Sequence, residues 1–327
     1  MATLIITNGD SAAELLAAAG RDGEILPWRD VLHEGRLLAG PLERNSAERA
    51  AFLAERFGLA AAEVAETFAG RDAVLRRHQS FDRIELWFEH DLYDQLQLVQ
   101  VLSFFADEGR SDGLLLVQTD EFLGHQRPET ILRFAEHARA VGEEELELGE
   151  QVWADLVMPT PDYVDRRLEE PLDRLPFLAP ALTRFLQELP GAHGLSRSEE
   201  AALALIGAGT AAPGRLFAAA LEKEEAAFMG DASFFAMLHG LAFAETPLIA
   251  GFTPIAGVDD PRDVLSAPTL DLTGAGKAVL AGEADHVALN GIDRWWAGTR
   301  LKGRDVWRYE RRQATLLPPE TGFQSHG

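Results

Sequence analysis

The chain has 327 residues, of which 46% are hydrophobic, so it holds enough apolar side chains to bury more than one core. Its 53 acidic and 30 basic residues give a net charge of −23, which repels nucleic acid and anionic membranes unless basic groups are concentrated locally. The absence of cysteine excludes disulfides, thiolate metal sites and a cysteine nucleophile. Because we find no signal-peptide pattern and no run of about eighteen apolar residues, we expect a cytoplasmic protein without a membrane partner.

Short apolar runs alternate with helical patterns over residues 1–126, an alternation typical of βαβ units. We predict strands at 4–7, 24–28, 83–88 and 114–119, with helices after each strand and two helices between the second and the third. Right-handed crossovers make these strands a parallel, Rossmann-like sheet with helices on both faces. The sequence therefore predicts an N-terminal α/β domain, although no G-x-G-x-x-G fingerprint for a dinucleotide follows the first strand.

The remaining chain divides into three predicted parts. A proline-interrupted helical connector covers residues 127–193, an α+β domain covers 194–312, and a frayed tail covers 313–327. The α+β domain begins where Ser196 can cap a helix and Glu199 can complete the capping box. Its predicted helices lie at 199–206, 214–225, 231–243 and 274–281, with strands at 247–250 and 269–273 and a terminal hairpin within 290–310. This order predicts a winged-helix-like fold.

Polar side chains follow all four predicted strands of the N-terminal domain. In an open parallel sheet, ligands bind beyond the carboxyl ends of the strands, where loops and helix N-termini converge. We therefore expect a functional site there, although Asp10 and Asp91 would also serve as ordinary helix N-caps. The residues that follow the strands are Asn8, Gly9, Asp10 and Ser11, then Arg29, Asp30 and His33, then Glu89, His90, Asp91, Asp94 and Gln95, and finally Asp120 and Glu121.

These residue types suit a small anionic ligand, such as a nucleotide or another phosphate-bearing molecule. Gly9 before a helix lets the backbone approach a ligand, the helix N-terminus favours an anion, and Arg29 can clamp phosphate. If the protein is an enzyme, it is a hydrolase or transferase in which His90, with Glu89 or Asp91, supplies acid–base chemistry. The candidate ligand-binding residues are Asn8, Gly9, Asp10, Ser11, Arg29, Asp30, His33, Asp94 and Gln95.

Two alternative chemistries use the same residues. His33 and His90, with the carboxylates of Asp10, Asp91 and Asp94, could hold a divalent metal that activates water, although no HxxxH or HxH pair supports this. The string Gly9-Asp10-Ser11 is similar to the nucleophile block of GDS-type serine hydrolases, with His90 as a conceivable base. The other sequence blocks of those enzymes are absent, so we interpret Ser11 as a helix cap. The sequence identifies neither a cofactor nor a metal.

The C-terminal domain suggests a regulator as the alternative function, with a protein or DNA partner. The helix expected to read DNA, 231–243, carries no arginine or lysine, which disfavours DNA. Basic residues gather later among tryptophans, and we interpret them as a solvated or partner-facing surface. They are Arg294, Arg300, Lys302, Arg304, Arg308, Arg311 and Arg312. Gly274-Ala275-Gly276-Lys277 lacks the leading glycine and closing Ser or Thr of a phosphate loop and is interpreted as a helix start.

Several long strings resemble a bacterial family whose N-terminal region is a domain of unknown function. They are Asn8-Gly9-Asp10-Ser11, the run from Pro27 to Gly35, the run from Trp87 to Gln97, Phe228-Met229-Gly230-Asp231 and the run from Leu289 to Trp295. The resemblance spans nearly the whole chain. It implies no established activity and supplies no catalytic residues, so the predicted site depends on the chemistry of the strand ends.

Overall fold

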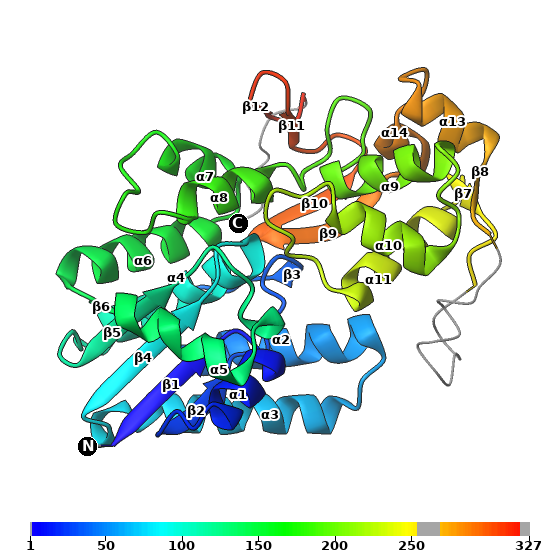
Figure 1. The fold of residues 1–327 in the computed structure, drawn as a ribbon. Coiled ribbons are helices and arrows are strands. Elements are labelled where there is room, and N and C mark those ends of the chain that lie inside the picture. Colours follow the sequence, from blue (N-terminus) through cyan, green and yellow to red (C-terminus); the bar gives the residue numbers. More distant parts are fainter. Residues whose placement is uncertain (1, 254–268, 321–327) are drawn as a thin grey trace. The chain divides into compact units, whose positions relative to one another are not determined.

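The computed structural model describes residues 2–253 and 269–320, which form two compact units (Figure 1). Unit 1 comprises residues 1–55, 59–183 and 297–299, and unit 2 comprises 56–58, 184–296 and 300–327. The division at residue 184 falls inside the segment predicted as a connector, most of which belongs with the sheet. Part of the predicted loop between 250 and 269 and part of the predicted tail lie outside the described residues.

A five-stranded sheet lies at the centre of unit 1, with the strand order β2-β1-β4-β5-β6 (Figure 1). The first four of these strands are parallel, which confirms the predicted α/β fold. They are β1 (Thr3–Thr7), β2 (Glu24–Pro27), β4 (Arg83–Phe88) and β5 (Leu114–Gln118). The edge strand β6 (Arg139–Ala140) is antiparallel to β5, and with two residues it is too short to show a strand pattern in the sequence.

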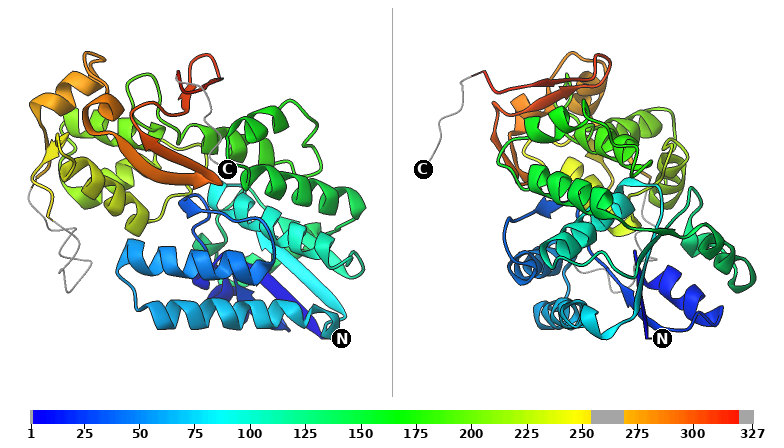
Figure 2. Two further views of the ribbon diagram at one scale, coloured as in Figure 1. Left: turned by 180° about the vertical axis from the view of Figure 1, so that it is seen from behind. Right: turned by 90° about the vertical axis from the view of Figure 1, so that its left-hand side faces the viewer.

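The helices that connect the strands cover both faces of this sheet, as predicted. They are α1 (Asp10–Ala18), α2 (Leu42–Phe57), α3 (Ala61–Arg76) and α4 (Leu92–Asp107), with the short strand β3 (Gly35–Arg36) before α2 and the 3-10 turn η1 (His78–Ser80) after α3. In the sheet, β2 lies on one side of β1 and β4 lies on the other. The chain therefore moves to one side to form β2 and then crosses back past β1 to form β4. Right-handed crossovers therefore place α1 on one face and α3 and α4 on the other (Figure 2). The sheet has its switch point between β1 and β4.

Each face of the sheet is buried under its helices. On the α1 side, Ile5, Trp87 and Val117 pack against Ala12 and Leu16 of the helix. Further cover there comes from η2 (Leu123–His125), α5 (Pro128–Ile131) and η3 (Leu132–His137). On the opposite side, α6 (Glu143–Leu156) packs along α4 and is followed by α7 (Asp162–Arg167). Because α4 lies between the sheet and α6, even its glutamines are buried.

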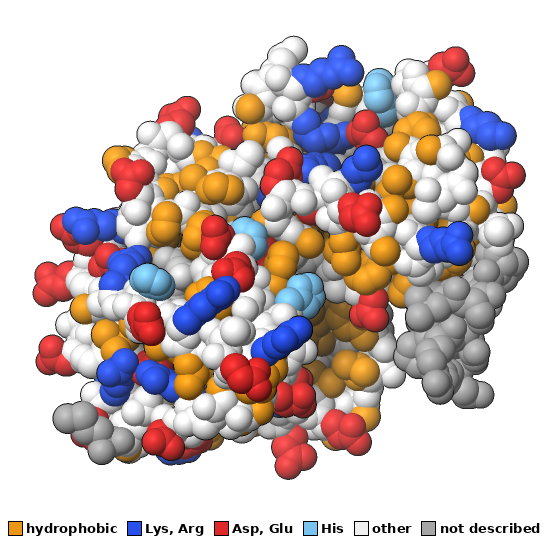
Figure 3. Space-filling model, viewed as in Figure 1, with side chains coloured by type: hydrophobic (Ala, Val, Ile, Leu, Met, Phe, Trp, Pro, Cys, Tyr) orange, Lys and Arg blue, Asp and Glu red, His pale blue; other side chains and the backbone are white. Residues whose placement is uncertain are grey.

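The surface carries charges of both signs. On the face drawn in Figure 3, acidic and basic side chains are interspersed. Exposed ion pairs include Arg133 with Glu121 and Arg300 with Asp293. Within the described ranges, the structure contains no helix with the length and apolar character needed to span a bilayer.

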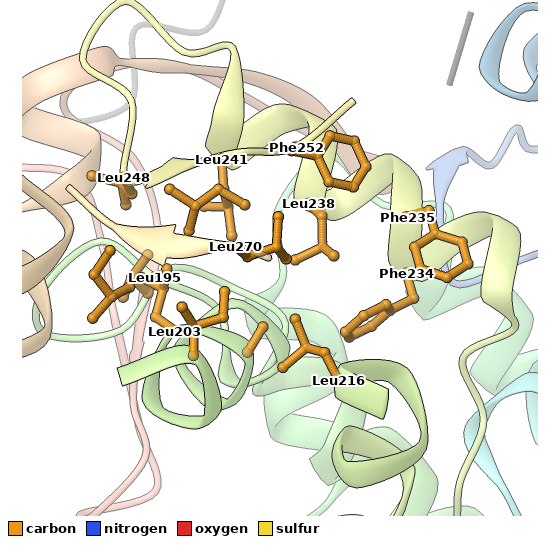
Figure 4. Packing of buried hydrophobic residues seen from close by; sticks show 14 of the residues in the cluster. Leu195, Leu203, Leu216, Phe234, Phe235, Leu238, Leu241, Leu248, Phe252 and Leu270 are labelled. Carbon is orange, nitrogen blue, oxygen red and sulfur yellow. The ribbon is translucent and has the colours of Figure 1, made fainter. Parts of the chain in front are cut away.

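Unit 2 is built around a core of leucines and phenylalanines that the helices and two short strands enclose (Figure 4). Its elements are the last turn of α8 (Leu178–Leu186), α9 (Arg197–Gly207), α10 (Pro213–Leu221), α11 (Asp231–Ala242), β7 (Ile249–Ala250), β8 (Asp271–Leu272), α13 (Gly274–Leu280) and α14 (His286–Asn290). The capping box of Ser196 and Glu199 is confirmed at the start of α9. Helix α10 ends four residues before its predicted end. Glu224 and Glu225, three and four residues beyond Leu221, accept hydrogen bonds from Arg184 and Arg197.

Two small hairpins form the C-terminal part of the described chain, and the turn of the first, residues 297–299, is counted with unit 1. The first joins β9 (Ile292–Ala297) to β10 (Thr299–Gly303), within the range predicted for a terminal hairpin. The second pairs β11 (Arg308–Glu310) with β12 (Thr315–Leu317), so part of the predicted frayed tail is a strand. The order of three helices and two antiparallel strands matches the prediction for this unit. The winged-helix assignment itself stays a prediction, because β7 and β8 have two residues each.

Candidate functional site

The candidate site lies at the switch point, where Asn8 follows β1 and Glu89 follows the adjacent strand β4. The Asn8 side-chain amide donates hydrogen bonds to Glu89 Oε1 at 3.0 Å and to Asp94 Oδ2 at 2.9 Å. The backbone N–H of Glu89 donates to Asp94 Oδ1 at 2.7 Å. One amide therefore ties together the ends of two strands and the first turn of α4.

The surrounding chain holds Glu89 in place. The backbone N–H of Leu123, in η2, donates to Glu89 Oε1 at 2.7 Å. The Gln95 side-chain amide donates to the Glu89 carbonyl oxygen at 2.6 Å. Gln95 thus supports the site from α4. Its predicted contact with a ligand stays a prediction.

Asp91 is both the N-cap of α4 and a neighbour of the two other carboxylates. Its Oδ1 accepts a hydrogen bond from the Asp94 backbone N–H at 3.1 Å, the usual N-cap contact. Asp10 does not cap α1: Gly9 occupies the N-cap position, with no side-chain hydrogen bond to the helix. The helix-cap interpretation is therefore right for Asp91 and wrong for Asp10.

Glu89, Asp91 and Asp94 form a buried acidic trio. Each offers a carboxylate oxygen, these oxygens lie within 4.8 Å of one another, and no side chain of the three is more than 4% exposed. Their hydrogen-bond donors are the Asn8 amide and backbone N–H groups. In the part of the chain that the structure describes, no arginine or lysine bonds to the trio.

The electrostatics of the trio favour a proton or a cation. Burial, and then the charge of Glu89, raise the pKa of Asp91 to about 7. Burial also raises the pKa of Glu89 and, together with the neighbouring carboxylates, raises the pKa of Asp94 well above its ordinary value. A divalent cation with oxygen ligands, such as Mg²⁺ or Mn²⁺, would relieve the same repulsion. Of the residues predicted as metal ligands, Asp91 and Asp94 belong to this group, whereas His33, His90 and Asp10 do not.

His90 lies between Glu89 and Asp91 in the sequence, and its ring is near two phenylalanine rings. Its ring lies 5.3 Å from the ring of Phe122 and 5.9 Å from that of Phe177, between centroids. Burial lowers the pKa of His90, and the charge of Asp120 opposes this only in part. Its buried Nδ1 has no hydrogen-bond partner among the described residues. The imidazole is therefore neutral at neutral pH and able to accept a proton.

Arg29 lies next to Asn8 but is already paired. Its backbone N–H donates to the Asn8 carbonyl oxygen at 3.3 Å, and its exposed guanidinium bonds Asp10 at 2.8 Å. Its φ of 54° places it in the left-handed region. An anion bound by Arg29 must therefore compete with Asp10.

Asp30 and His33 support the loop between β2 and β3. Asp30 pairs with Arg49 at 2.9 Å, and both side chains are fully buried. Arg49 also donates to the carbonyl oxygens of Val31 and Glu34, so this pair holds the loop in shape. The His33 ring packs against that of Tyr93 at 6.2 Å. The structure therefore gives Asp30 a structural partner and places His33 outside the acidic trio.

Ser11 lies in the first turn of α1 and is exposed, with its Cβ near Gly124. Its interpretation as a helix cap is wrong, because Gly9 is the N-cap and no side chain caps this helix. Among the described residues, its hydroxyl makes no hydrogen bond to His90. The nucleophile-and-base pair that a serine hydrolase needs is therefore not formed in this arrangement.

Three residues of the site have no counterpart in the sequence prediction. Leu123 supplies a backbone donor to Glu89, and Phe122 and Phe177 flank His90. Phe122 and Leu123 directly follow the polar end of the fourth strand, so a longer window there would have included them. Phe177 lies in a proline-rich segment without any distinguishing pattern.

The basic residues near the C-terminus are largely used within unit 2. Arg308 pairs with Asp285, Arg311 with Glu200, and Arg300 with Asp293. Arg304 donates to the Ala288 carbonyl oxygen.

The Gly276 segment is a helix start, as interpreted from the sequence. Thr273 caps α13, and a Cβ on Gly276 would lie 2.0 Å from the Leu248 carbonyl oxygen. This glycine is explained by close packing rather than by phosphate.

Comparison with known proteins gives no further identification: no family model matches the chain, and no curated protein matches it. The family resemblance of the sequence strings therefore stays a prediction. Three of those strings do meet in the structure, since Asn8, the loop that contains Asp30 and the start of α4 are joined by hydrogen bonds.

Proposed function

We propose that unit 1 binds a small phosphate-bearing ligand of the nucleotide type at the switch point, with a divalent cation between the phosphate and the acidic trio. The observation that carries this proposal is the meeting of three buried carboxylates there, without a basic partner among the described residues. Ligands of open α/β sheets bind at such a point.

The cation reconciles two properties of the site. Three carboxylates would repel a phosphate, and bringing them together unpaired in a buried position is unfavourable. A bound Mg²⁺ or Mn²⁺ is held by carboxylates and commonly shares its remaining coordination positions with phosphate oxygens. Glu89, Asp91 and Asp94 would supply the protein ligands.

Helix α1 supports the phosphate end of this ligand. Its N-cap is Gly9, which has no side chain that could bond to the first turn. The backbone N–H groups of that turn and the helix dipole therefore suit an anion. A Cβ on Gly9 would meet no atom within 4 Å, so there is space in front of the helix.

His90 is the proposed proton acceptor if the ligand is transformed. It is neutral, half-buried and next in sequence to Glu89 and Asp91. It would accept the proton of a water or hydroxyl group whose oxygen bonds to the phosphorus while the P–O bond to the leaving group breaks, as in a hydrolase or transferase.

Isothermal titration calorimetry with MnCl₂, followed by AMP, tests this proposal. We expect Mn²⁺ to bind the parent protein with one site, and AMP to bind at least tenfold more tightly when Mn²⁺ is present. Asp94→Asn should lose both effects because it removes one charge of the trio. Asp112→Asn is the control. Asp112 precedes the amino end of β5, at the opposite end of the strands from the site, so this variant should behave as the parent. Equal Mn²⁺ binding by all three proteins would refute the cation site. His90→Gln should retain Mn²⁺ binding.

A further inference from the structure

A row of aromatic rings adjoins the acidic trio in unit 1. Between ring centroids, His125 lies 5.4 Å from Phe122, Phe122 lies 5.3 Å from His90, and His90 lies 5.9 Å from Phe177. We call these residues the aromatic row. They come from the loop after β4, from the region of η2 and from the residue before α8, so the packing of the chain brings them together.

The aromatic row is joined to the trio at two points. His90 lies between Glu89 and Asp91 in the sequence. Phe122 directly precedes Leu123, whose backbone N–H donates to Glu89 Oε1 at 2.7 Å. A ligand held by the trio therefore has aromatic side chains in its immediate surroundings.

The aromatic row leads away from α1. Both η2 and α5 pack against α1, as the position of α5 shows (Figure 1). A Cβ on Gly124, in η2, would lie 3.2 Å from the Cβ of Ser11 in the first turn of α1. Phe122, which directly precedes η2, is therefore at the α1 end of the row, and Phe177 follows beyond His90. A ligand with its phosphate at α1 can extend along the row.

The rings of the aromatic row are open to solvent in part. His125 is exposed, and the other three side chains are partly exposed. The ring planes meet at 49° between Phe122 and His90 and at 67° between His90 and Phe177, so these rings do not stack face to face.

A structural aromatic pair in unit 2 provides the contrast. Phe185 and Trp296 stack at 4.2 Å with their planes 19° apart, and they are 0% and 3% exposed. That pair fills a core, whereas the row combines partial exposure, tilted rings and a polar site next to it. Such rings offer a flat ligand a surface for stacking.

We propose that the aromatic row binds the base of a nucleotide whose phosphate lies at α1 and the trio. The base packs on Phe177, at the end of the row away from α1, and His90 stays beside the phosphate end. This inference rests on the proposed function and names the other half of its ligand. A base is neutral, so the acidic trio does not repel it. Because every base has a flat π-face, stacking requires a base but selects weakly among bases.

Calorimetry of the full chain at saturating MnCl₂ tests the proposal with AMP, UMP and ribose 5-phosphate. The three ligands share a phosphate and a ribose, and only the last lacks a base. We expect AMP and UMP to bind within tenfold of each other. Ribose 5-phosphate should bind at least fivefold more weakly than either, which is about the lower limit of what stacking on one aromatic side chain contributes.

Variants of Phe177 identify the ring that contacts the base. Phe177→Leu keeps an apolar side chain without a ring, so it should weaken AMP binding at least fivefold and leave Mn²⁺ and ribose 5-phosphate binding unchanged. Phe177→Trp restores a ring and should bind AMP as the parent does. Phe243→Leu is the control, because Phe243 is 51% exposed and also lies beside a histidine, His239 at 4.7 Å, but belongs to unit 2. It should behave as the parent.

The outcomes separate this inference from the proposed function. If neither AMP nor ribose 5-phosphate binds the Mn²⁺-loaded protein, the proposed phosphate site is wrong and this inference is wrong with it. The proposed function stands and the role of the aromatic row is refuted if ribose 5-phosphate binds as tightly as AMP. The same holds if Phe177→Leu binds AMP as the parent does, or if it weakens both ligands equally.

Discussion

At the scale of single residues, the partners of a buried carboxylate decide its role. Burial alone would raise the pKa of Glu85, but hydrogen bonds from Arg21 and Trp87 lower it. The pKa of Glu188 is lowered in the same way by Arg184. Among the residues that the structure describes, Glu89, Asp91 and Asp94 have no such partner, and their pKa values are raised. This contrast distinguishes a candidate ligand site from ordinary structural ion pairs.

The pH dependence of stability should reveal this repulsion. Because the pKa of Asp91 rises from 3.8 to about 7 on folding, the folded protein binds more protons between these values, and its contribution to the free energy of unfolding falls as pH rises. Asp91→Asn keeps an N-cap acceptor but removes the charge. In EDTA-treated protein, urea unfolding should show this variant more stable than the parent at pH 7, by on the order of 1–4 kcal/mol.

The difference between Asp91→Asn and the parent should approach zero at about pH 2 to 3, below the unfolded-state pKa of 3.8, where the Asp91 carboxyl is protonated in both states. With Mn²⁺ at pH 7, the order should reverse, because only the parent keeps the full trio. Parallel stability curves over this pH range would show that Asp91 is not repelled by its neighbours.

At the scale of elements, the N-termini of two helices allow a matched comparison. Helices α1 and α3 both begin after a residue in extended conformation that makes no capping hydrogen bond, namely Gly9 and Ala60. At α3 the missing cap lowers the free energy of unfolding, and no functional gain offsets the loss. At α1 the uncapped turn begins directly after Asn8 and Gly9, and Asn8 belongs to the candidate site, so the same loss suits anion binding.

Gly9→Asp and Ala60→Asp should therefore separate stability from binding. Each aspartate caps its helix, which raises the free energy of unfolding by a few tenths of a kcal/mol at Gly9 and by about 1 kcal/mol at Ala60. Only Gly9→Asp places a carboxylate where phosphate binds, so it should weaken Mn²⁺-dependent AMP binding at least tenfold. Calorimetry and urea unfolding measure the two effects. If both variants bind AMP as the parent does, α1 does not hold the phosphate.

At the scale of the whole molecule, the net charge of −23 is the dominant property. Surface ion pairs offset it locally, but 53 acidic groups face only 30 basic ones. Repulsion among the excess carboxylates opposes the compact state and is screened by salt. The acidic trio adds a local repulsion between its carboxylates. Monovalent ions screen this repulsion poorly, because the trio is buried.

Thermal unfolding in two salts should distinguish these contributions. Raising NaCl from about 10 to about 150 mM should raise the Tm of the parent and of Asp94→Asn alike, because the Debye length shortens to about 8 Å. MgCl₂ at matched ionic strength should raise the Tm further in the parent alone. Differential scanning calorimetry measures both. A Tm that falls with NaCl, or a Mg²⁺ effect that persists in Asp94→Asn, would contradict the respective explanation.

The sequence by itself determined the local features of this protein. The four parallel strands, the helices between them, the Ser196 capping box and the polar strand ends depend on hydrophobic period, turn residues and caps, which act between near neighbours in the chain. The charge of −23 and the absence of thiol chemistry are also properties of composition alone.

Only the tertiary structure decided which polar residues meet. The strand order places β1 beside β4, so Asn8 reaches Glu89, 81 residues later, whereas Asp30 turns to Arg49. Phe177 joins the site from a segment with no pattern that points to it, and Leu123 joins it from just beyond the polar end of the fourth strand. The physical reason is that a contact between distant parts of the chain depends on the order of strands and the packing of helices, and local periodicity specifies neither.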